Sequence, residues 1–354
     1  MSPMQACAEH WRSQTGVTVN WEARSLEAFG DQPLEEVAGD YDLLVIDHPF
    51  CGRAERTGCL TPLDALLDDA TLATLSAGAI GPSHDSYTYA GRQWGLATDA
   101  ACQVAAARDD LMAGEAAPQT WDEALDLARR MPGMVAPPLA PPHAISSWLS
   151  IVGAHGQEPF ASEEVDGRAT ALLAELARLG PEEALGWEPP DALARMTTTD
   201  EIAYIPLIYG YSTYATSAAR PCRFTDAPAA ADGPRGAVLG GAGLSVSAAS
   251  AQPAEAAAFA AWASGAQAQH DVVARTGGQA GHRSVWDDHE LDALAGGFYS
   301  GTRASIERAW VRPRDDWWPG FQLDAGSLLT DNLLDGDPYA VAARLRELHR
   351  RHST

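Results

Sequence analysis

The stretch from Tyr41 to Phe50 carries an uninterrupted apolar run, Leu43 to Ile46, with no polar alternation. Such a run predicts a strand buried on both faces, as in the parallel sheets of α/β proteins. Asp47-His48-Pro49 follows, and proline ends the strand there. Because ligands of open α/β sheets bind beyond the carboxyl ends of strands, Asp47 and His48 are candidate ligand contacts. The alternative is that Asp47 caps the next turn and His48 is simply exposed.

The first residues show helical periodicity followed by a short β-like segment. Pro3 to Thr15 places apolar residues on one face and ends at Gly16, the residue type that tolerates a left-handed terminal conformation. Val17 to Trp21 predicts a strand. Together with the strand at Tyr41 to Ile46, this spacing predicts a parallel βαβ arrangement and a doubly wound lobe.

Three later segments give further local signals. Thr120 and Glu123 form a capping-box pattern at the start of an amphipathic helix. A buried strand is predicted over Thr199 to Leu207, and it leads into Tyr209 and Tyr211. The strand pattern between 236 and 246 has glycines in its interior, which indicates a bend or a close approach of a ligand to the backbone.

Composition narrows the class of protein. The 354 residues are enough for two lobes. Asp and Glu number 48 against 24 Lys and Arg, giving a net charge of -24, so nucleic acid is not an expected partner. The sequence contains no lysine, which excludes a Schiff-base enzyme and a P-loop. Arginine is therefore the only strong cationic anchor for an anionic ligand.

The cysteines and the apolar runs exclude further classes of site. The chain has 5 cysteines and no CxxC pair, so neither a zinc knuckle nor a disulfide framework is indicated. Cys51 and Cys59 could bridge across a short loop, although isolated thiols are the favoured interpretation. No apolar stretch is long enough to span a membrane, and the first residues lack the pattern of a secretory signal.

Five motifs occur in one order along nearly the whole chain, and together they resemble a known family. They lie at Trp11 to Val19, Tyr41 to Leu44, Gly95 to Asp99, Pro118 to Glu123 and Gly240 to Phe259. This order is similar to that of extracellular solute-binding proteins of ABC importers, a family with many sugar binders.

The resemblance implies an α/β, two-lobed, periplasmic-binding-protein-like fold of type II, with hinge strands between the lobes. Lobe 1 would comprise residues 1–103 plus 243–292, and lobe 2 residues 104–242 plus 293–354. A small polar ligand, such as a sugar, polyol or small organic acid, would be held in the interlobe cleft by hinge closure. Permease subunits are the implied partners, and the implied location is periplasmic or extracellular. We expect a monomer and no cofactor or metal.

The chain departs from the family pattern at its beginning. Family members open with a strand before the first helix and with an export signal, whereas this sequence opens on a helix. An empty strand position would leave neighbouring strand edges unpaired. We therefore expect a natural start upstream of Met1, with a strand and an export signal, or a cytoplasmic relative. The alternative is a lobe in which Val17 to Trp21 and Tyr41 to Ile46 close the gap themselves.

Catalytic chemistry has weak support in the sequence. His48 with Asp47, or His282 with Arg283, could be proposed as acid and base, but no nucleophile elbow or metal-ligand spacing accompanies them. We therefore expect a binding protein rather than an enzyme. The alternative is a cytoplasmic enzyme or sensor that reuses the fold, with His48 and Asp47 as acid and base.

The ligand candidates are residues at strand ends, at hinge crossings and in loops. Trp94, Trp148, Trp317 and Trp318 lie beside loops or helix ends, where an aromatic face could stack on a sugar; a core position is the alternative for each. Arg314 would bind a ligand carboxylate if it points into the cleft, or pair with a neighbouring aspartate if it does not. The full set is Asp47, His48, Trp94, Asp99, Trp148, Tyr209, Tyr211, Gly241, Gln279, Arg314 and Trp317.

Overall fold

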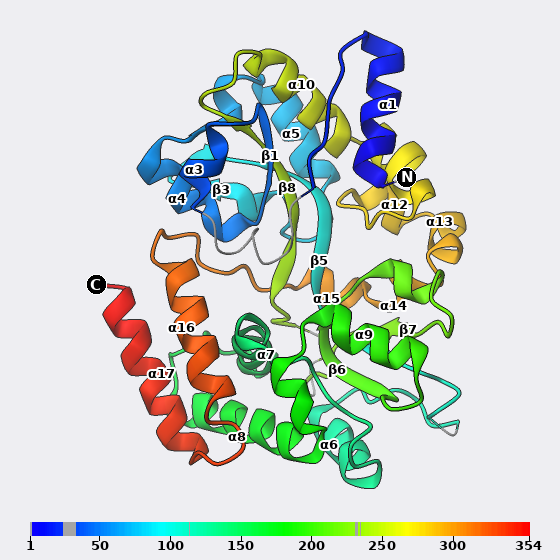
Figure 1. The fold of residues 1–354 in the computed structure, drawn as a ribbon, viewed down its shortest axis with the longest axis vertical. Helices are drawn as coiled ribbons and strands as arrows, with labels where there is room; N and C mark the ends of the chain where they lie inside the picture. The colour runs from blue at the N-terminus through cyan, green and yellow to red at the C-terminus, as the bar shows by residue number, and fades with distance from the viewer. Residues whose placement is uncertain (1, 24–32, 113, 231–232, 234) are drawn as a thin grey trace. The chain divides into compact units, whose positions relative to one another are not determined.

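The computed structural model describes residues 2–23, 33–112, 114–230, 233 and 235–354. The chain forms two compact units (Figure 1). Unit 1 comprises Met1–Ala100, Gly240–Leu294 and Arg312–Asp316, and unit 2 comprises Ala101–Leu239, Ala295–Val311 and Trp317–Thr354. Unit 1 therefore includes the short segment Arg312–Asp316, which the sequence analysis assigned to lobe 2.

Unit 1 is built from short helices around the strands β1 to β4 and parts of β5 and β8. Its strands are β1 Leu43–Ile46, β2 Leu60–Thr61, β3 Thr88–Tyr89 and β4 Arg92–Gln93. Its α-helices are α1 Pro3–Thr15, α3 Leu34–Ala38, α4 Cys51–Thr57, α5 Asp69–Gly78, α10 Pro253–Ser264, α11 Ala266–Ala268, α12 Arg283–Trp286 and α13 His289–Leu294. Its short 3-10 helices are η1 His48–Phe50, η2 Leu63–Ala65, η3 Asp85–Tyr87 and η7 Ala274–Thr276. A π-helical turn forms η6 Gln269–Val273.

Unit 2 has longer helices. Its α-helices are α6 Trp121–Arg130, α7 Pro141–Ala154, α8 Glu163–Leu179, α9 Pro189–Thr198, α14 Phe298–Gly301, α15 Arg303–Glu307, α16 Trp318–Thr330 and α17 Pro338–His352. The remaining elements are β6 Tyr204–Tyr209, β7 Arg223–Thr225, η4 Glu182–Gly186 and η5 Ser212–Ala215. The chain passes between the units within β5 Leu96–Ala107 and at the start of β8 Leu239–Ser247.

The strand order is β1-β8-β5-β6, with β2 beside β8 and β7 beside β5. The predicted parallel pairing of residues 17–21 with β1 is wrong for the described residues, because residues 17–21 form no strand and β1 pairs with β8 in antiparallel orientation. The alternative in which these two segments close the gap is therefore not what the structure shows. The apolar run of β1 did predict a strand, but its partner lies about 200 residues further along the chain.

The predicted ends of two helices are confirmed. Gly16 caps α1 with φ 78°, and its N–H donates to the carbonyl of Arg12, a conformation that suits glycine. At α6 the capping box is present: the Thr120 hydroxyl accepts from the N–H of Glu123, whose carboxylate accepts from the N–H of Thr120. These bonds satisfy donors that a helix N-terminus would otherwise leave unpaired.

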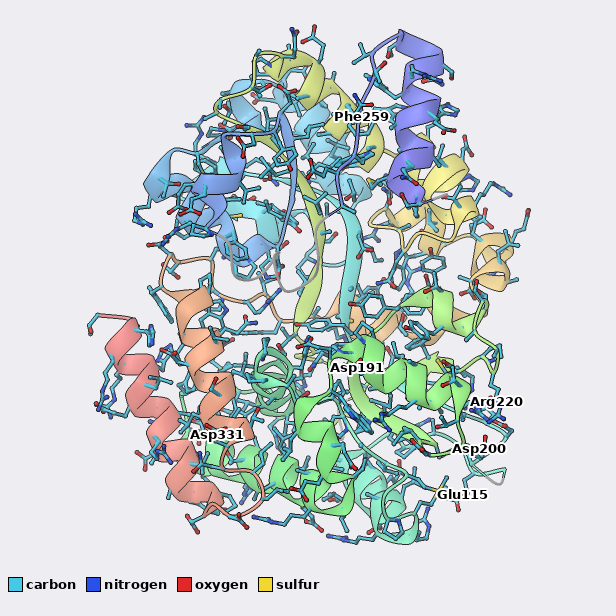
Figure 2. All side chains as sticks on the ribbon, in the orientation of Figure 1. Glu115, Asp191, Asp200, Arg220, Phe259 and Asp331 are labelled. Carbon is cyan, nitrogen blue, oxygen red and sulfur yellow. The ribbon has the colours of Figure 1, made fainter. Side chains whose placement is uncertain are left out.

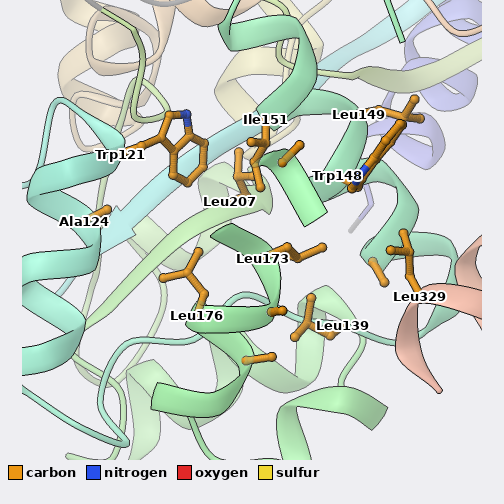
Figure 3. Close-up of a cluster of buried hydrophobic side chains, with 14 of the residues drawn as sticks. Trp121, Ala124, Leu139, Trp148, Leu149, Ile151, Leu173, Leu176, Leu207 and Leu329 are labelled. Carbon is orange, nitrogen blue, oxygen red and sulfur yellow. The ribbon is translucent and has the colours of Figure 1, made fainter. Parts of the chain in front are cut away.

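Each unit has its own apolar core. In unit 1, Phe259 of α10 and Leu244 and Val246 of β8 are completely buried. In unit 2, helices α7, α8 and α16 pack around Trp148, Leu173 and Leu329 (Figure 3). Burying several hundred Å² of apolar surface at about 25 cal/mol per Å² makes each core a main source of stability.

The state of the cysteines and the lengths of the helices can be compared with the sequence. All 5 cysteines are free, with Cys51 buried and Cys59 half-buried, so the isolated-thiol interpretation is confirmed. Within the described residues, no helix is both long enough and apolar enough to cross a bilayer.

Candidate functional site

Asp47 sits directly after β1 and is held by a buried arginine within unit 1. Its backbone begins η1, and its carboxylate accepts the His48 N–H at 2.8 Å. Nη2 of Arg312 donates to both carboxylate oxygens, at 2.8 and 2.6 Å, and Arg312 is 4% exposed. Burial alone would raise the pKa of Asp47, but the charge of Arg312 and contact with His48 hold it well below the usual range. Asp47 is therefore ionised and already paired.

His48, which we predicted as a ligand contact, is completely buried. Its Nδ1 lies 3.1 Å from Asp47 Oδ1, and its ring packs edge-on against Tyr87. Burial, reinforced by the nearby Arg312 charge, lowers the pKa of His48 to about 4 despite the carboxylate beside it. The ring is neutral at pH 7 and is shielded from a substrate.

The glycines inside β8 make room for a side chain of the protein itself. A Cβ on Gly243 would lie 2.6 Å from the Tyr87 ring, and one on Gly95 would lie 2.8 Å from it. The Tyr87 hydroxyl donates to the carbonyl of Ile46 at 3.2 Å. At Gly243, therefore, the group that lies close to the backbone is the Tyr87 side chain of the protein itself. Gly241, which we predicted as a ligand contact, has φ 112° and sits in the same strand, where few other residues could adopt that backbone.

Asp99 in β5 has an unusual titration among the predicted residues. Its side chain is half-buried, and this burial raises its pKa to about 7. At neutral pH the carboxyl is present in both protonation states, so it can either donate or accept a hydrogen bond. A carboxyl perturbed in this way is a candidate for ligand contact.

Two further predicted residues of unit 1 serve the fold. Gln279 is 8% exposed, and its amide donates to the carbonyl of Ala100 at 2.9 Å. Trp94 is 5% exposed, and its indole N–H donates to the carbonyl of Tyr89 at 3.0 Å. Both side chains are therefore buried and hydrogen-bonded within unit 1.

Arg314 pairs with neither of the aspartates that follow it. Its Nη1 lies 3.4 Å from the carbonyl oxygen of Asp85. Asp315 accepts from the Tyr89 hydroxyl, and Asp316 pairs with Arg53 and Arg56 of α4. The segment Arg312–Asp316 is therefore fixed to unit 1 by several polar contacts, and Arg314 is half-buried among them.

In unit 2, Tyr209 ends β6 and lies beside the first turn of α7. Its hydroxyl is 3.4 Å from the Ser146 hydroxyl, and its ring packs edge-on against His143 at 6.1 Å between centroids. Nε2 of His143 is 2.5 Å from Glu188 Oε2, and this hydrogen bond lowers the pKa of Glu188. Tyr209 and His143 are half-buried, so an aromatic face and polar groups occur together at the end of a strand.

The predicted tryptophans of unit 2 separate into core and surface. Trp148 lies within α7, is 0% exposed, and donates to the Thr170 hydroxyl at 2.8 Å, so its placement beside a helix end was wrong. Trp318 is also buried. Trp317 is half-buried, like Trp310, and both pack edge-on against Trp318.

Tyr211 follows the end of β6, two residues after Tyr209. It is 38% exposed and packs edge-on against Tyr214. Sequence reasoning missed Arg312, His143 and Trp310. His143 had one available signal, because it lies in the first turn of a helix that begins with two prolines. Among the described residues, no group of three or more His, Cys, Asp or Glu could hold a metal ion.

Solved structures with similar folds are solute-binding proteins. The chain has a TM-score of 0.81 and 20% identity to the ABC transporter solute-binding protein of Agrobacterium radiobacter K84 in complex with ribitol, covering 99% of this chain and 96% of that one. It has a TM-score of 0.78 and 19% identity to the corresponding protein of Agrobacterium vitis S4 with bound D-mannitol, covering 99% and 94%. Its TM-score to maltose-bound MalE3 of T. maritima is 0.82, with 18% sequence identity, and the match covers 99% of this chain and 96% of that one.

These similarities confirm the two-lobed solute-binding fold that the sequence motifs implied. No curated protein matches the sequence. Residues 6–293 match the family described as bacterial extracellular solute-binding protein. Because this match covers most of the chain, the protein belongs to the bacterial extracellular solute-binding protein family.

Proposed function

We propose that the protein binds a sugar or polyol and delivers it to the permease of an ABC-type importer. Family membership supports a ligand-binding role in transport. The observation that carries the ligand class is the group formed by Tyr209, His143, Ser146 and Glu188 in unit 2. Proteins of similar fold are described with ribitol, D-mannitol or maltose, which is consistent with this class.

The Tyr209 group combines the two kinds of contact that a sugar needs. A tyrosine ring offers an apolar face to the C–H groups of a sugar, while hydroxyl and carboxylate groups exchange hydrogen bonds with its hydroxyls. Glu188 is 41% exposed and is oriented by His143, and Tyr209 is held by Ser146. The group is therefore positioned before a ligand arrives, which lowers the entropy lost on binding.

A neutral ligand fits the arginines better than an acid does. A ligand carboxylate typically binds a guanidinium through two hydrogen bonds. Arg312 already donates twice to Asp47, and Arg314 is directed to the Asp85 carbonyl. Because the guanidinium groups of Arg312 and Arg314 are directed to groups of the protein, neither contact suggests a site for a ligand carboxylate. We therefore favour a sugar or polyol over a small organic acid.

We propose binding without chemical turnover. The enzyme alternative requires His48 to exchange a proton with a substrate, but His48 is 0% exposed and burial lowers its pKa to about 4. We also propose that the protein acts outside the cytoplasmic membrane, because the family is described as extracellular. We further propose that it acts as a monomer.

Titration calorimetry with ribitol, D-mannitol, maltose and malate tests the ligand class. We expect a sugar or polyol to bind and to raise the unfolding temperature by mass action. Tyr209→Ala should weaken that binding by roughly tenfold to a hundredfold, as expected for loss of a stacking contact worth about 1 to 3 kcal/mol. Leu323→Ala, at a 52% exposed position of α16, is the matched control and should bind normally.

Three outcomes would contradict these proposals. Binding of malate alone would overturn the neutral ligand class. Wild-type affinity in Tyr209→Ala would remove Tyr209 from the site while leaving the ligand class intact. Conversion of a ligand into product, abolished by His48→Ala, would overturn the binding-only role.

A further inference from the structure

Helix α7 carries a row of polar side chains that are buried instead of facing water. His143, Ser146, Ser147 and Ser150 follow the spacing i, i+3, i+4 and i+7, so they lie on one face of the helix. The exposed fraction of each serine is 3% or less. The other buried side of α7, which includes Trp148, is apolar and belongs to the core of unit 2 (Figure 3). We call the three serines the serine face of α7.

The serine face is hydrogen-bonded to Gln103 of β5, which is completely buried. Nε2 of Gln103 donates to the Ser147 hydroxyl at 3.3 Å, and the Ser150 hydroxyl donates to Oε1 of Gln103 at 2.7 Å. The Ser150 hydroxyl also accepts the backbone N–H of Val238 at 2.9 Å. Because buried polar groups are costly unless they are paired, these bonds fix the helix to both segments.

Val238 is the point where three segments of unit 2 meet. The Gln103 N–H donates to the carbonyl of Val238 at 3.1 Å. Trp310 bridges Val238 in parallel orientation and makes two backbone hydrogen bonds of 2.8 Å with the residues on either side of it. Gln103, Val238 and Trp310 each lie within three residues of a position where the chain passes between the units. Ser150 therefore holds the centre of three crossing segments.

The backbone of one crossing segment also packs directly on α7. A Cβ on Gly153 would lie 2.6 Å from the carbonyl oxygen of Gly236. One on Gly236, which has φ 72°, would lie 2.3 Å from the carbonyl carbon of Gly153. Neither position leaves room for a side chain, so residues 236–238 are fixed to the helix by close packing as well as by Ser150.

The first turns of α7 hold the group to which we assigned sugar binding. Tyr209 lies opposite Gln103 in the ladder of β5 and β6, and directly opposed residues direct their side chains to the same face of a sheet. The Tyr209 hydroxyl lies 3.4 Å from the hydroxyl of Ser146. Glu188 of the same group is fixed by Asp191, labelled in Figure 2, whose carboxylate accepts the Glu188 N–H at 3.0 Å. The serine face thus contacts the ligand group and the crossing segments.

We propose that the serine face of α7 couples ligand occupancy of the Tyr209 group to the three crossing segments. This inference rests on the proposed sugar-binding function. A ligand that restrains Tyr209 restrains α7 and, through Ser150 and Gln103, the segments that meet at Val238. Ser150 is a positioning residue in this scheme, because it acts on Val238 and not on the ligand. Coupling of this kind is reciprocal, so loosening the crossing segments must weaken ligand binding.

Ser150→Ala tests the anchoring part of the proposal without a ligand. The variant removes the acceptor of the Val238 N–H, and amide hydrogen exchange at residues 103, 238 and 310 should become at least about fivefold faster. Thr170→Val is the matched control, because it removes another buried hydroxyl of unit 2, the one that accepts the Trp148 indole N–H at 2.8 Å. Equal exchange at the three amides in the two variants would overturn the proposal.

The same amides test the coupling with a bound ligand, for which we use whichever of ribitol, D-mannitol and maltose binds the wild-type protein in calorimetry. The ligand should slow exchange at residues 238 and 310 by at least about threefold in the wild type and in Thr170→Val. In Ser150→Ala this slowing should be lost at saturating ligand, and the affinity should fall by about threefold to tenfold.

The outcomes separate this inference from the proposed function. Slowing of equal size in Ser150→Ala, or a wild-type complex without slowing at residue 238, would overturn the coupling and leave the sugar-binding function intact. A purely structural clamp would give faster exchange without ligand but no response to the ligand. Absence of binding of all three compounds to the wild type would overturn the proposed ligand class, and with it the coupling to that ligand.

Discussion

Replacing Asp99 by asparagine should stabilise the protein at alkaline pH more than at acidic pH. Asp99 is half-buried in β5, and this burial raises its pKa to about 7. In the unfolded chain an aspartate titrates near about 3.9. The favourable contribution of the protonated carboxyl is therefore fully present below about pH 4 and is lost as the pH rises through about 7.

The difference between the two pKa values sets the size of the effect. Each pKa unit corresponds to about 1.4 kcal/mol, so the ceiling is roughly 4 kcal/mol above pH 8. About 2.5 kcal/mol of this develops between pH 5 and pH 8. Because the side chain is only half-buried, solvent screening reduces the effect, and we expect about 1 kcal/mol over this interval.

Urea unfolding, followed by tryptophan fluorescence at pH 5 and pH 8, measures how much the free energy of unfolding changes between these two pH values. The wild-type protein and Asp69→Asn, an exposed control in α5, should lose the same stability between the two pH values. In Asp99→Asn this loss should be smaller by about 1 kcal/mol. If all three proteins show the same pH dependence, the assignment of a raised pKa to Asp99 is refuted.

Two further substitutions test the buried contacts. Arg312→Met should destabilise the protein by about 3 to 5 kcal/mol because it leaves the Asp47 carboxylate without its partner, and adding Asp47→Asn should restore part of that loss in urea unfolding. Trp148→Ala should cost about 3 to 5 kcal/mol by opening a cavity in the unit 2 core, whereas Leu323→Ala should change stability by less than about 0.5 kcal/mol. A mild effect of Trp148→Ala in thermal and urea unfolding would contradict its place in the core.

The helices were predictable where their signals are local. The Gly16 cap and the Thr120 capping box depend on backbone groups within four residues, and both appear as expected. The segment at residues 17–21 shows the limit of this reasoning. Its alternating burial is typical of a strand, but a strand also needs a partner, and the partner is not encoded within the segment.

The burial of Trp94 and Trp148 could not be predicted for a related reason. Trp94 and Trp148 were assigned from the loops and helix ends near them, but each is buried and donates its indole N–H to a group of its own unit. Burial of a tryptophan depends on which segments pack over it, and these segments are distant in sequence. Tyr209 could be placed at a strand end from sequence, but its neighbour His143 lies 66 residues earlier, so the group around it could not be read locally.

Asp47 shows how a correct position can have a different role. The sequence predicted Asp47 directly after a buried strand, and in the structure it follows β1 and caps η1. Its principal partner, Arg312, lies 265 residues away in a segment with two arginines and two aspartates, which gave no local reason to prefer one pairing. Because Arg312 donates to both oxygens of this carboxylate and holds it ionised, Asp47 is already paired within unit 1, and its role follows from a contact that only the folded chain brings together.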